Sequence, residues 1–506
     1  MTTHGEVERI TPGKLSECIA AARRSLLDRD MGPDDPEDFD SLFAGLSRIG
    51  SFPGVYQAVA IAPLRDALTR LGAAGFSLMR SSEQGHLLVL DIAQALCQRY
   101  GGYHRRELMA FQEVVSDLFD GFLSAEDRRG LKPPDRPIPA PLVKWGRPEL
   151  GPYTFAADQM SVLGVGCGVV SLPGAVARGD GLFAWGALPH EACGHDVIAC
   201  ERGLIGELAL KVASALRKDL PSLAATLGLG EKDWSQALEP LIDHWVFTLE
   251  EAVSDVLGVL NMGPAAAIAG LILLCASIED DDDAREQSLV ADLLDRHPVP
   301  ALRVLLTAEV LRNAGFGGTD ATRQWPGRLA SLLELEISAL VGSRTISIAG
   351  QVIDRRFAFA SARVVGSVIT KARVAALGRA SLRSIQTWRD RDEQIVGWLR
   401  AVLSGREGES VEELLGADFY AAHVVAAAIL EGLARPANIP LLHHDMITLL
   451  ATMHQANPSW GPLGLLYASD LSPRVAAVNR HMQTRRSGTG GIPRMFARLV
   501  VGDRKS

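Results

Sequence analysis

The run Val256–Ile278, VLGVLNMGPAAAIAGLILLCASI, contains no charged residue and is apolar on every side of any helix that it forms. It is long enough to cross a bilayer, but Asn261 and Pro264 interrupt it and no second span accompanies it. A helix that is apolar all round otherwise lies at the centre of a large core. The run therefore predicts buried helices at the centre of a mainly α, multi-lobed protein.

The composition is that of a globular protein. The chain has 506 residues, which at about 100–200 residues per domain allows two to four domains. Apolar residues make up 47% of it and charged residues 22%. The net charge of −9 is spread over the whole length and gives no reason to expect nucleic acid or a membrane as partner.

The sequence divides into four segments. The first two are a helical region, 1–130, and a proline-rich linker, 131–152. Helical spacing is clear in Leu87–Leu96, in Leu108–Phe122 and in the leucines that follow Pro63. The seven prolines between residues 131 and 152 exclude a regular helix. That segment is expected to be a linker or an extended strap around the next lobe.

The third and fourth segments are a catalytic region, 153–330, and a C-terminal helical region, 331–506. Two β-like runs open the catalytic region, at residues 161–173 and at Gly181–Leu188 (GLFAWGAL). They predict a small β element before the metal-binding helix, and GLFAWGAL is a candidate edge strand that could pair with an extended peptide. The acidic cluster Glu279–Asp283 is expected to be a solvated loop, and the tail from Arg485 to be loose.

The segment after GLFAWGAL carries the motif HEACGH, with histidines at 190 and 195. Zinc peptidases commonly place two histidines four residues apart, so that both face the metal from one side of a helix. Five residues on a regular helix turn the second ring about 140° away from the first. One extra residue, accommodated as a π-bulge, restores a shared face, and Gly194 is a permissive place for it. The motif therefore predicts a metal site on an irregular helix.

The helix expected downstream, DHWVFTLEEAVSDVLG, supplies carboxylates that complete this site. Glu251 and Asp255 are four residues apart and share a face. We assign Glu251 as the third metal ligand, and expect Asp255 and Glu250 to accept hydrogen bonds from the two ligand histidines. Two histidines and one glutamate leave a fourth tetrahedral position for water, which is the arrangement of catalytic zinc. Glu191, next to the first ligand, is then placed to act as the general base.

The paired motifs HEACGH and EEAVSD resemble the HExxGH and EExxx(D/E) motifs of the dipeptidyl peptidase III family of zinc exopeptidases. That family belongs to the gluzincins, in which the third ligand is a glutamate. The resemblance implies Zn²⁺ on His190, His195 and Glu251, with Glu191 catalytic. It covers His190–Asp255 and extends to no other part of the chain.

The sequence thus predicts a zinc-dependent hydrolase, a metallopeptidase acting on short peptides or on a peptide-like metabolite. Two other functions stay open. The same two histidines and carboxylate form the facial triad of non-haem Fe²⁺ oxygenases, although an oxygenase has no evident use for Glu191. A non-catalytic helical scaffold that retains a relic of the site is the third.

Weaker candidates lie elsewhere. His244 is seven residues before Glu251, on roughly the same helical face, and could contact substrate, although a packed core histidine is the more common case. Cys193 and Cys200 flank His195 at a spacing that matches no compact zinc site. Oxyanion donors could come from Tyr153, Tyr420, His423, His443, His444 or Tyr467.

The six cysteines are too few for a disulfide framework. The N-terminus, MTTHGEVERITPGK, lacks a basic segment followed by an apolar one. The cytoplasm is therefore the expected location.

Overall fold

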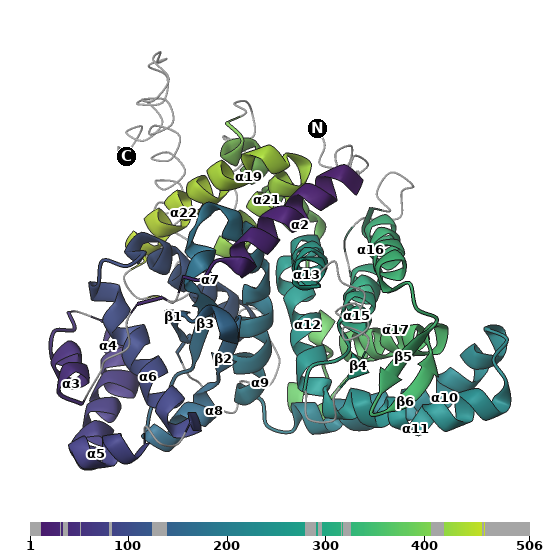
Figure 1. Ribbon diagram of the computed structural model, residues 1–506, viewed down its shortest axis with the longest axis horizontal. Coiled ribbons are helices and arrows are strands. Elements are labelled where there is room, and N and C mark those ends of the chain that lie inside the picture. Colours follow the sequence, from purple (N-terminus) through teal and green to yellow (C-terminus); the bar gives the residue numbers. More distant parts are fainter. Residues whose placement is uncertain are drawn as a thin grey trace, which may run out of the picture.

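The structure is a computed structural model that describes residues 12–30, 32–33, 39–50, 52–79, 83–123, 139–278, 290–291, 296–314, 316, 325–405, 419–457 and 460. Most of these residues are helical and only two small sheets interrupt them, so the prediction of a mainly α, multi-lobed protein is confirmed (Figure 1). The acidic cluster Glu279–Asp283, residues 131–138, Tyr467 and the tail from Arg485 lie outside the described residues.

The described residues between Pro12 and Leu123 are mostly helical. Helix α6 contains the run Leu87–Leu96, and α7 contains Leu108–Phe122. The elements here are α2 (Pro12–Leu27), α3 (Phe39–Ser47), α4 (Gly54–Tyr56), η1 (Gln57–Ile61), α5 (Ala62–Met79), α6 (Glu83–Cys97), η2 (Gln98–Tyr100) and α7 (Arg105–Leu123).

A three-stranded sheet separates two hydrophobic clusters. Strand β3 (Val169–Pro173) lies between β1 (Leu142–Gly146), which is parallel to it, and β2 (Tyr153–Phe155), which is antiparallel. Leu142 and its partner Val169 face a smaller cluster formed with α3–α6, whereas Val143 and Val170 face the main core. Alternate residues point to opposite faces of a strand, so β1 and β3 are buried on both sides, whereas β2 is only partly buried. It is the β element expected before the metal-binding helix, and β1 lies inside the segment expected as a linker.

Short helical turns connect these strands to η7 (His190–Asp196), which carries the HEACGH motif. They are η3 (Pro148–Leu150), α8 (Ala157–Met160), η4 (Ser161–Leu163), η5 (Gly174–Ala177) and η6 (Gly179–Ala187). The prediction of a strand at GLFAWGAL is wrong, because η6 is a 3₁₀ helix. Both edges of β3 are already taken, and Gly186 packs so tightly that a Cβ there would lie 2.2 Å from the Cβ of Ala269. The run is buried against helices instead of joining a sheet.

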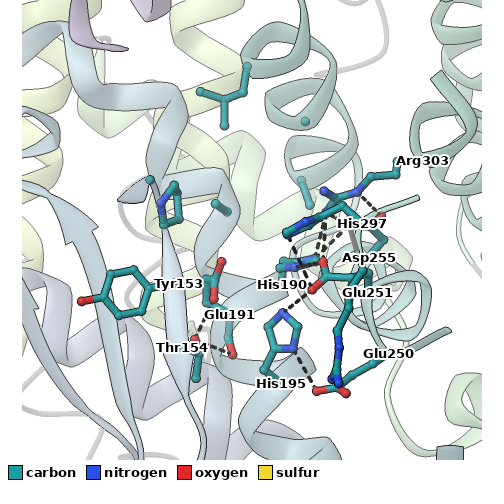
Figure 2. A pocket seen from close by; sticks show the side chains of 18 of the residues that line it. Tyr153, Thr154, His190, Glu191, His195, Glu250, Glu251, Asp255, His297 and Arg303 are labelled. Atoms are coloured by element: carbon teal, nitrogen blue, oxygen red, sulfur yellow. Dashed lines mark hydrogen bonds and ion pairs between the residues drawn. The ribbon is translucent and has the colours of Figure 1, made fainter. Parts of the chain in front are cut away.

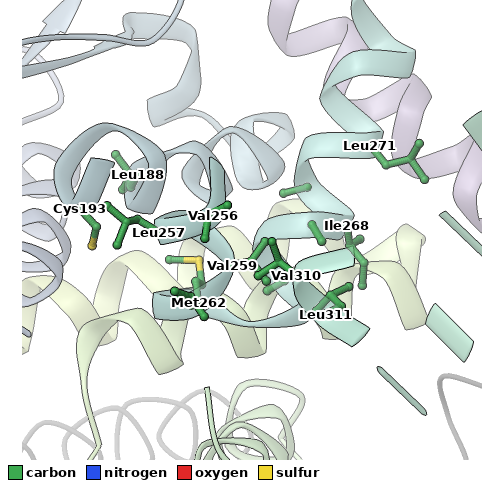
Figure 3. Packing of buried hydrophobic residues seen from close by; sticks show 14 of the residues in the cluster. Leu188, Cys193, Val256, Leu257, Val259, Met262, Ile268, Leu271, Val310 and Leu311 are labelled. Atoms are coloured by element: carbon green, nitrogen blue, oxygen red, sulfur yellow. The ribbon is translucent and has the colours of Figure 1, made fainter. Parts of the chain in front are cut away.

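The central run Val256–Ile278 forms the end of one buried helix and the whole of the next. Helices α12 (Leu249–Met262) and α13 (Pro264–Ser277) meet at Gly263, which has a positive φ of 59°. Their side chains pack into the main core (Figure 3), so the prediction of central helices is confirmed. No helix among the described residues is long and apolar enough to cross a membrane.

The remaining elements surround α12 and α13. Before them come η7 (His190–Asp196), α9 (Val197–Cys200), α10 (Leu204–Thr226) and α11 (Glu231–Phe247). After them come β4 (Val290–Ala291), α15 (Pro300–Asn313), α16 (Trp325–Val341), β5 (Thr345–Ile348), β6 (Gln351–Asp354), α17 (Arg355–Lys371), η9 (Ala375–Leu377), α18 (Leu382–Ile385), α19 (Asp390–Leu403), α21 (Ala421–Ala434), η10 (Pro436–Asn438) and α22 (Ile439–Gln455). The small sheet β4–β5–β6 was not expected from the sequence.

Candidate metal centre

The motif HEACGH forms a π-helical segment, η7, inside a longer helical stretch that continues into α9. A π turn holds one residue more than an α turn. The two histidine rings consequently lie close together, with their centroids 5.0 Å apart. The expected π-bulge is therefore present.

Gly194 has a different role from the one expected. It does not have a positive φ. A Cβ at this position would lie 2.3 Å from the Cβ of Ser254, on α12. The missing side chain thus lets η7 approach α12, which brings the histidines next to the carboxylates of α12.

The two histidines face one carboxylate and are each held by another (Figure 2). His190 Nε2 lies 3.2 Å from Glu251 Oε2, and His195 Nε2 lies 3.3 Å from Glu251 Oε1. On the other side of the rings, His190 Nδ1 is 2.8 Å from Asp255 Oδ1 and His195 Nδ1 is 3.4 Å from Glu250 Oε1. Both Nε2 atoms are therefore directed toward the Glu251 carboxylate.

The donor set fits a divalent metal. The ligand atoms of His190, His195 and Glu251 all lie within 4.8 Å of one another. Tetrahedral zinc keeps its ligand atoms roughly 3.3 Å apart, since its Zn–N bonds are about 2.0–2.1 Å long. Glu251 Oε2 is buried and makes no hydrogen bond of ordinary geometry to the described residues, although His190 Nε2 lies beside it. An orphaned buried oxygen of this kind is satisfied by a cation between the two atoms.

The electrostatics of these groups favour positive charge at the same point. Burial would lower the pKa of His190, but the carboxylates of Asp255 and Glu251 outweigh it and raise that pKa to about 10. Burial would raise the pKa of Glu251, but His190, His195 and Arg303 lower it to about 2. The carboxylates thus stay ionised beside His190 and Arg303, and their negative charge would also favour a metal ion.

Glu191 is buried beside the ligands and is held by a residue that the sequence did not single out. The Thr154 hydroxyl, on β2, donates to Glu191 Oε2 at 2.7 Å. Glu191 Oε1 makes no hydrogen bond to the described residues. A threonine in a short strand 37 positions before the glutamate carries no motif, so only the fold could reveal this contact.

Arg303, on α15, also escaped the sequence analysis. Its Nε and Nη2 donate to Asp255 Oδ2 and Oδ1, each at 2.8 Å. Such a bidentate contact fixes a carboxylate in orientation, and Asp255 in turn holds His190. The same guanidinium keeps the pKa of Asp255 well below its usual range in spite of burial, which by itself would raise it.

His297 is a further imidazole near the site. Its Nε2 lies 3.8 Å from Glu251 Oε1, and its side chain is 59% exposed. It lies in the segment that leads into α15. Its distance along the chain from the HEACGH motif matches no known spacing of metal ligands.

The candidate metal centre opens on a cavity of about 1030 Å³. His190, Glu191, His195 and Glu251 all line it. Of the six oxyanion candidates, Tyr153 lines it as well, and its hydroxyl donates to Asp91 Oδ2 at 2.7 Å.

The other candidates among the described residues lie elsewhere in the fold. His443 binds the carbonyl of Val176, His423 binds Asp392, and neither lines the cavity. Tyr420 and His444 are also absent from the described lining.

His244 is not placed as a substrate contact. It is buried in α11 with its ring 5.8 Å from that of Trp245, and it is not among the described residues that line the cavity. Its spacing from Glu251 misleads because α11 and α12 are separate helices. Cys193 is buried and donates to the carbonyl of Leu118 at 3.2 Å, which is a packing role.

Comparison of the chain with protein-family models found no match, and comparisons with curated proteins and with solved structures found none either.

Proposed function

We propose that this chain is a zinc-dependent hydrolase, and specifically a metallopeptidase that cleaves short peptides or a peptide-like metabolite. The observation that carries the proposal is the convergence of His190 Nε2 and His195 Nε2 on Glu251, with each ring anchored by a second carboxylate. Anchoring of this kind fixes the tautomer and orientation of metal-binding imidazoles.

The position of each residue suggests its role in the proposed reaction. His190, His195 and Glu251 would hold the zinc, and all three line the cavity. A bound zinc lowers the pKa of water and polarises a carbonyl. Asp255 and Arg303 orient His190, and Glu250 orients His195.

Glu191 is the proposed general base, which accepts a proton from the attacking water. Because Thr154 occupies Oε2, Oε1 remains to accept a proton from the attacking water. The water oxygen forms the new bond to the scissile carbonyl carbon. The proton then passes from Glu191 to the leaving nitrogen as the C–N bond breaks, so the products are a carboxylic acid and an amine.

The position of Glu191 favours hydrolysis over the oxygenase alternative. A buried carboxylate is costly unless it is used or paired, and Glu191 is held by Thr154 beside the ligand site.

The described cysteines are free thiols, which supports a reducing compartment, the cytoplasm.

The test is metal analysis followed by peptide hydrolysis. Protein purified without chelator is expected to carry about one zinc per chain, which Glu251→Ala loses and Glu191→Gln retains. Cleavage of a peptide library is expected from wild type and from Glu231→Gln, a control on an exposed turn of α11, but not from Glu191→Gln. Iron in place of zinc would favour the oxygenase, and a protein that retains no metal would overturn the proposal.

A further inference from the structure

The cavity beside the metal centre has a second part with a different chemistry. The metal centre lies on η7 and the start of α12, whereas three other elements, α2, η6 and α13, are in mutual contact and line the same cavity. They contribute aliphatic side chains and glycines, among them Leu26, Ala187, Gly270 and Leu274. None of the described lining residues of these three elements is aromatic or charged.

Helix α13 presents one complete face to this space. The lining residues Ala266, Gly270, Leu273, Leu274 and Ser277 recur at helical spacing. All five are partly or fully exposed, although the other side of α13 is buried in the core. The Ser277 hydroxyl donates to the carbonyl of Leu274 and so adds no unpaired polar group. From Ala266 to Ser277 this apolar face is about 16 Å long.

Helix α2 is fixed over the far end of this face (Figure 1). Arg23 donates to the carbonyls of Cys275 and Ile278, the latter at 2.9 Å, and thereby caps the C-terminus of α13. The neighbouring Arg24 forms an ion pair with Asp180 of η6 at 2.8 Å. These contacts hold Leu26, which is 39% exposed, at the cavity wall.

Two glycines distinguish the packed side of α13 from the side that lines the cavity. A Cβ at Gly186 of η6 would clash with Ala269, so the packed side of α13 is full. A Cβ at Gly270 would meet no atom within 4 Å, so the lining side is open.

We propose that this part of the cavity binds an aliphatic acyl chain of the substrate, whose amide lies at the metal centre. The proposal rests on the proposed hydrolase function and adds the substrate class, an N-acylated peptide or amino acid amide. An elongated wall of aliphatic and small residues, without aromatic or charged side chains among the described residues, matches a flexible hydrocarbon chain, because burial of apolar surface is what such a wall offers.

The experiment uses alkyl hydroxamates, in which a hydroxamate binds the metal and the chain length varies. Affinities of acetohydroxamic, octanohydroxamic and dodecanohydroxamic acid are measured by calorimetry on the zinc-loaded protein. The affinity is expected to rise by up to about fourfold for each further buried methylene.

Gly270→Leu places a side chain in the apolar part, and its Cβ meets no atom within 4 Å. It is expected to leave the affinity for acetohydroxamic acid unchanged and to weaken binding of dodecanohydroxamic acid by about tenfold or more, the burial of about two methylenes. Gly206→Leu is the matched control, since Gly206 is also a helical glycine with open space but does not line the cavity.

The outcomes separate this inference from the function on which it rests. Hydroxamates that bind with no dependence on chain length, or a dependence that Gly270→Leu leaves unchanged, overturn the acyl-chain site and leave the metal site standing. Failure of every hydroxamate to bind overturns the hydrolase instead. In that case cis-parinaric acid, a fluorescent fatty acid, tests the apolar part on the metal-free protein, and its failure to bind, or binding that Gly270→Leu does not weaken, overturns the acyl-chain site too.

Discussion

Helices α12 and α13 are consecutive, each has 14 residues, and each presents one face to the same cavity. The face of α12 begins with Glu251 and Asp255, whereas the face of α13, which includes Gly270 and Leu274, has no charged residue. Only Gly263 separates the two helices.

The difference shows that charged lining residues need partners from other elements, whereas apolar lining residues do not. Buried carboxylates need partners, and Asp255 has them in His190, on η7, and Arg303, on α15. The lining face of α13 needs no polar partner, and open space adjoins it at Gly270. One end of the helix pair is therefore suited to chemistry and the other to binding.

The largest effect is expected from Glu251→Gln, which removes the charged ligand from α12. Metal affinity should fall by more than the ~100-fold that loss of an outer hydrogen-bond partner causes at most. Competition with a chromogenic chelator measures it. Glu231→Gln serves as the control, and an unchanged affinity in Glu251→Gln would remove α12 from the metal centre.

The next comparison lies within α12. Asp255→Asn should weaken metal binding by about 10–100-fold, because it disturbs the buried contacts to His190 and Arg303. Glu250→Gln should have the smaller effect, since the Glu250 side chain is 48% exposed and lies 3.4 Å from His195. The same chelator titration ranks the two variants. Equal losses would mean that the buried ion pair with Arg303 contributes nothing to ligand orientation.

The junction between the helices is tested by Gly263→Ala. The positive φ costs a residue with a side chain about 1–3 kcal/mol, and a Cβ here would also lie 2.6 Å from the Trp388 ring. The free energy of unfolding in urea should fall by at least that amount. A variant as stable as wild type would show that the turn between α12 and α13 tolerates a side chain.

The smallest effect is expected from Gly270→Ala, on the open face of α13. Gly270 is helical, has no positive φ and has space around it, so alanine should stabilise the protein by about 0.5–1 kcal/mol. The same urea titration checks it. Destabilisation would mean that this face packs against another part of the protein, which would contradict an open apolar wall.

Local sequence patterns predicted those features that depend on neighbours along the chain. The extra residue between His190 and His195 indicated the π turn, and the apolar run from Val256 indicated the buried helices. The strand at GLFAWGAL was wrong because a short, continuous apolar run is equally compatible with a buried helix, and the choice depended on packing against Ala269. The role of Gly194 was also misread, since Ser254 lies 60 positions away in the chain.

By itself, the sequence determined the residue types of the candidate centre and the helices that carry them, because helical periodicity and motif spacing are local properties. Only the tertiary structure decided which residues support that centre. Thr154 on β2 and Arg303 on α15 reach Glu191 and Asp255 from elements far along the chain, and the apolar wall requires α2, η6 and α13 to meet. Such contacts depend on how the core packs as a whole, and no short stretch of sequence contains that information.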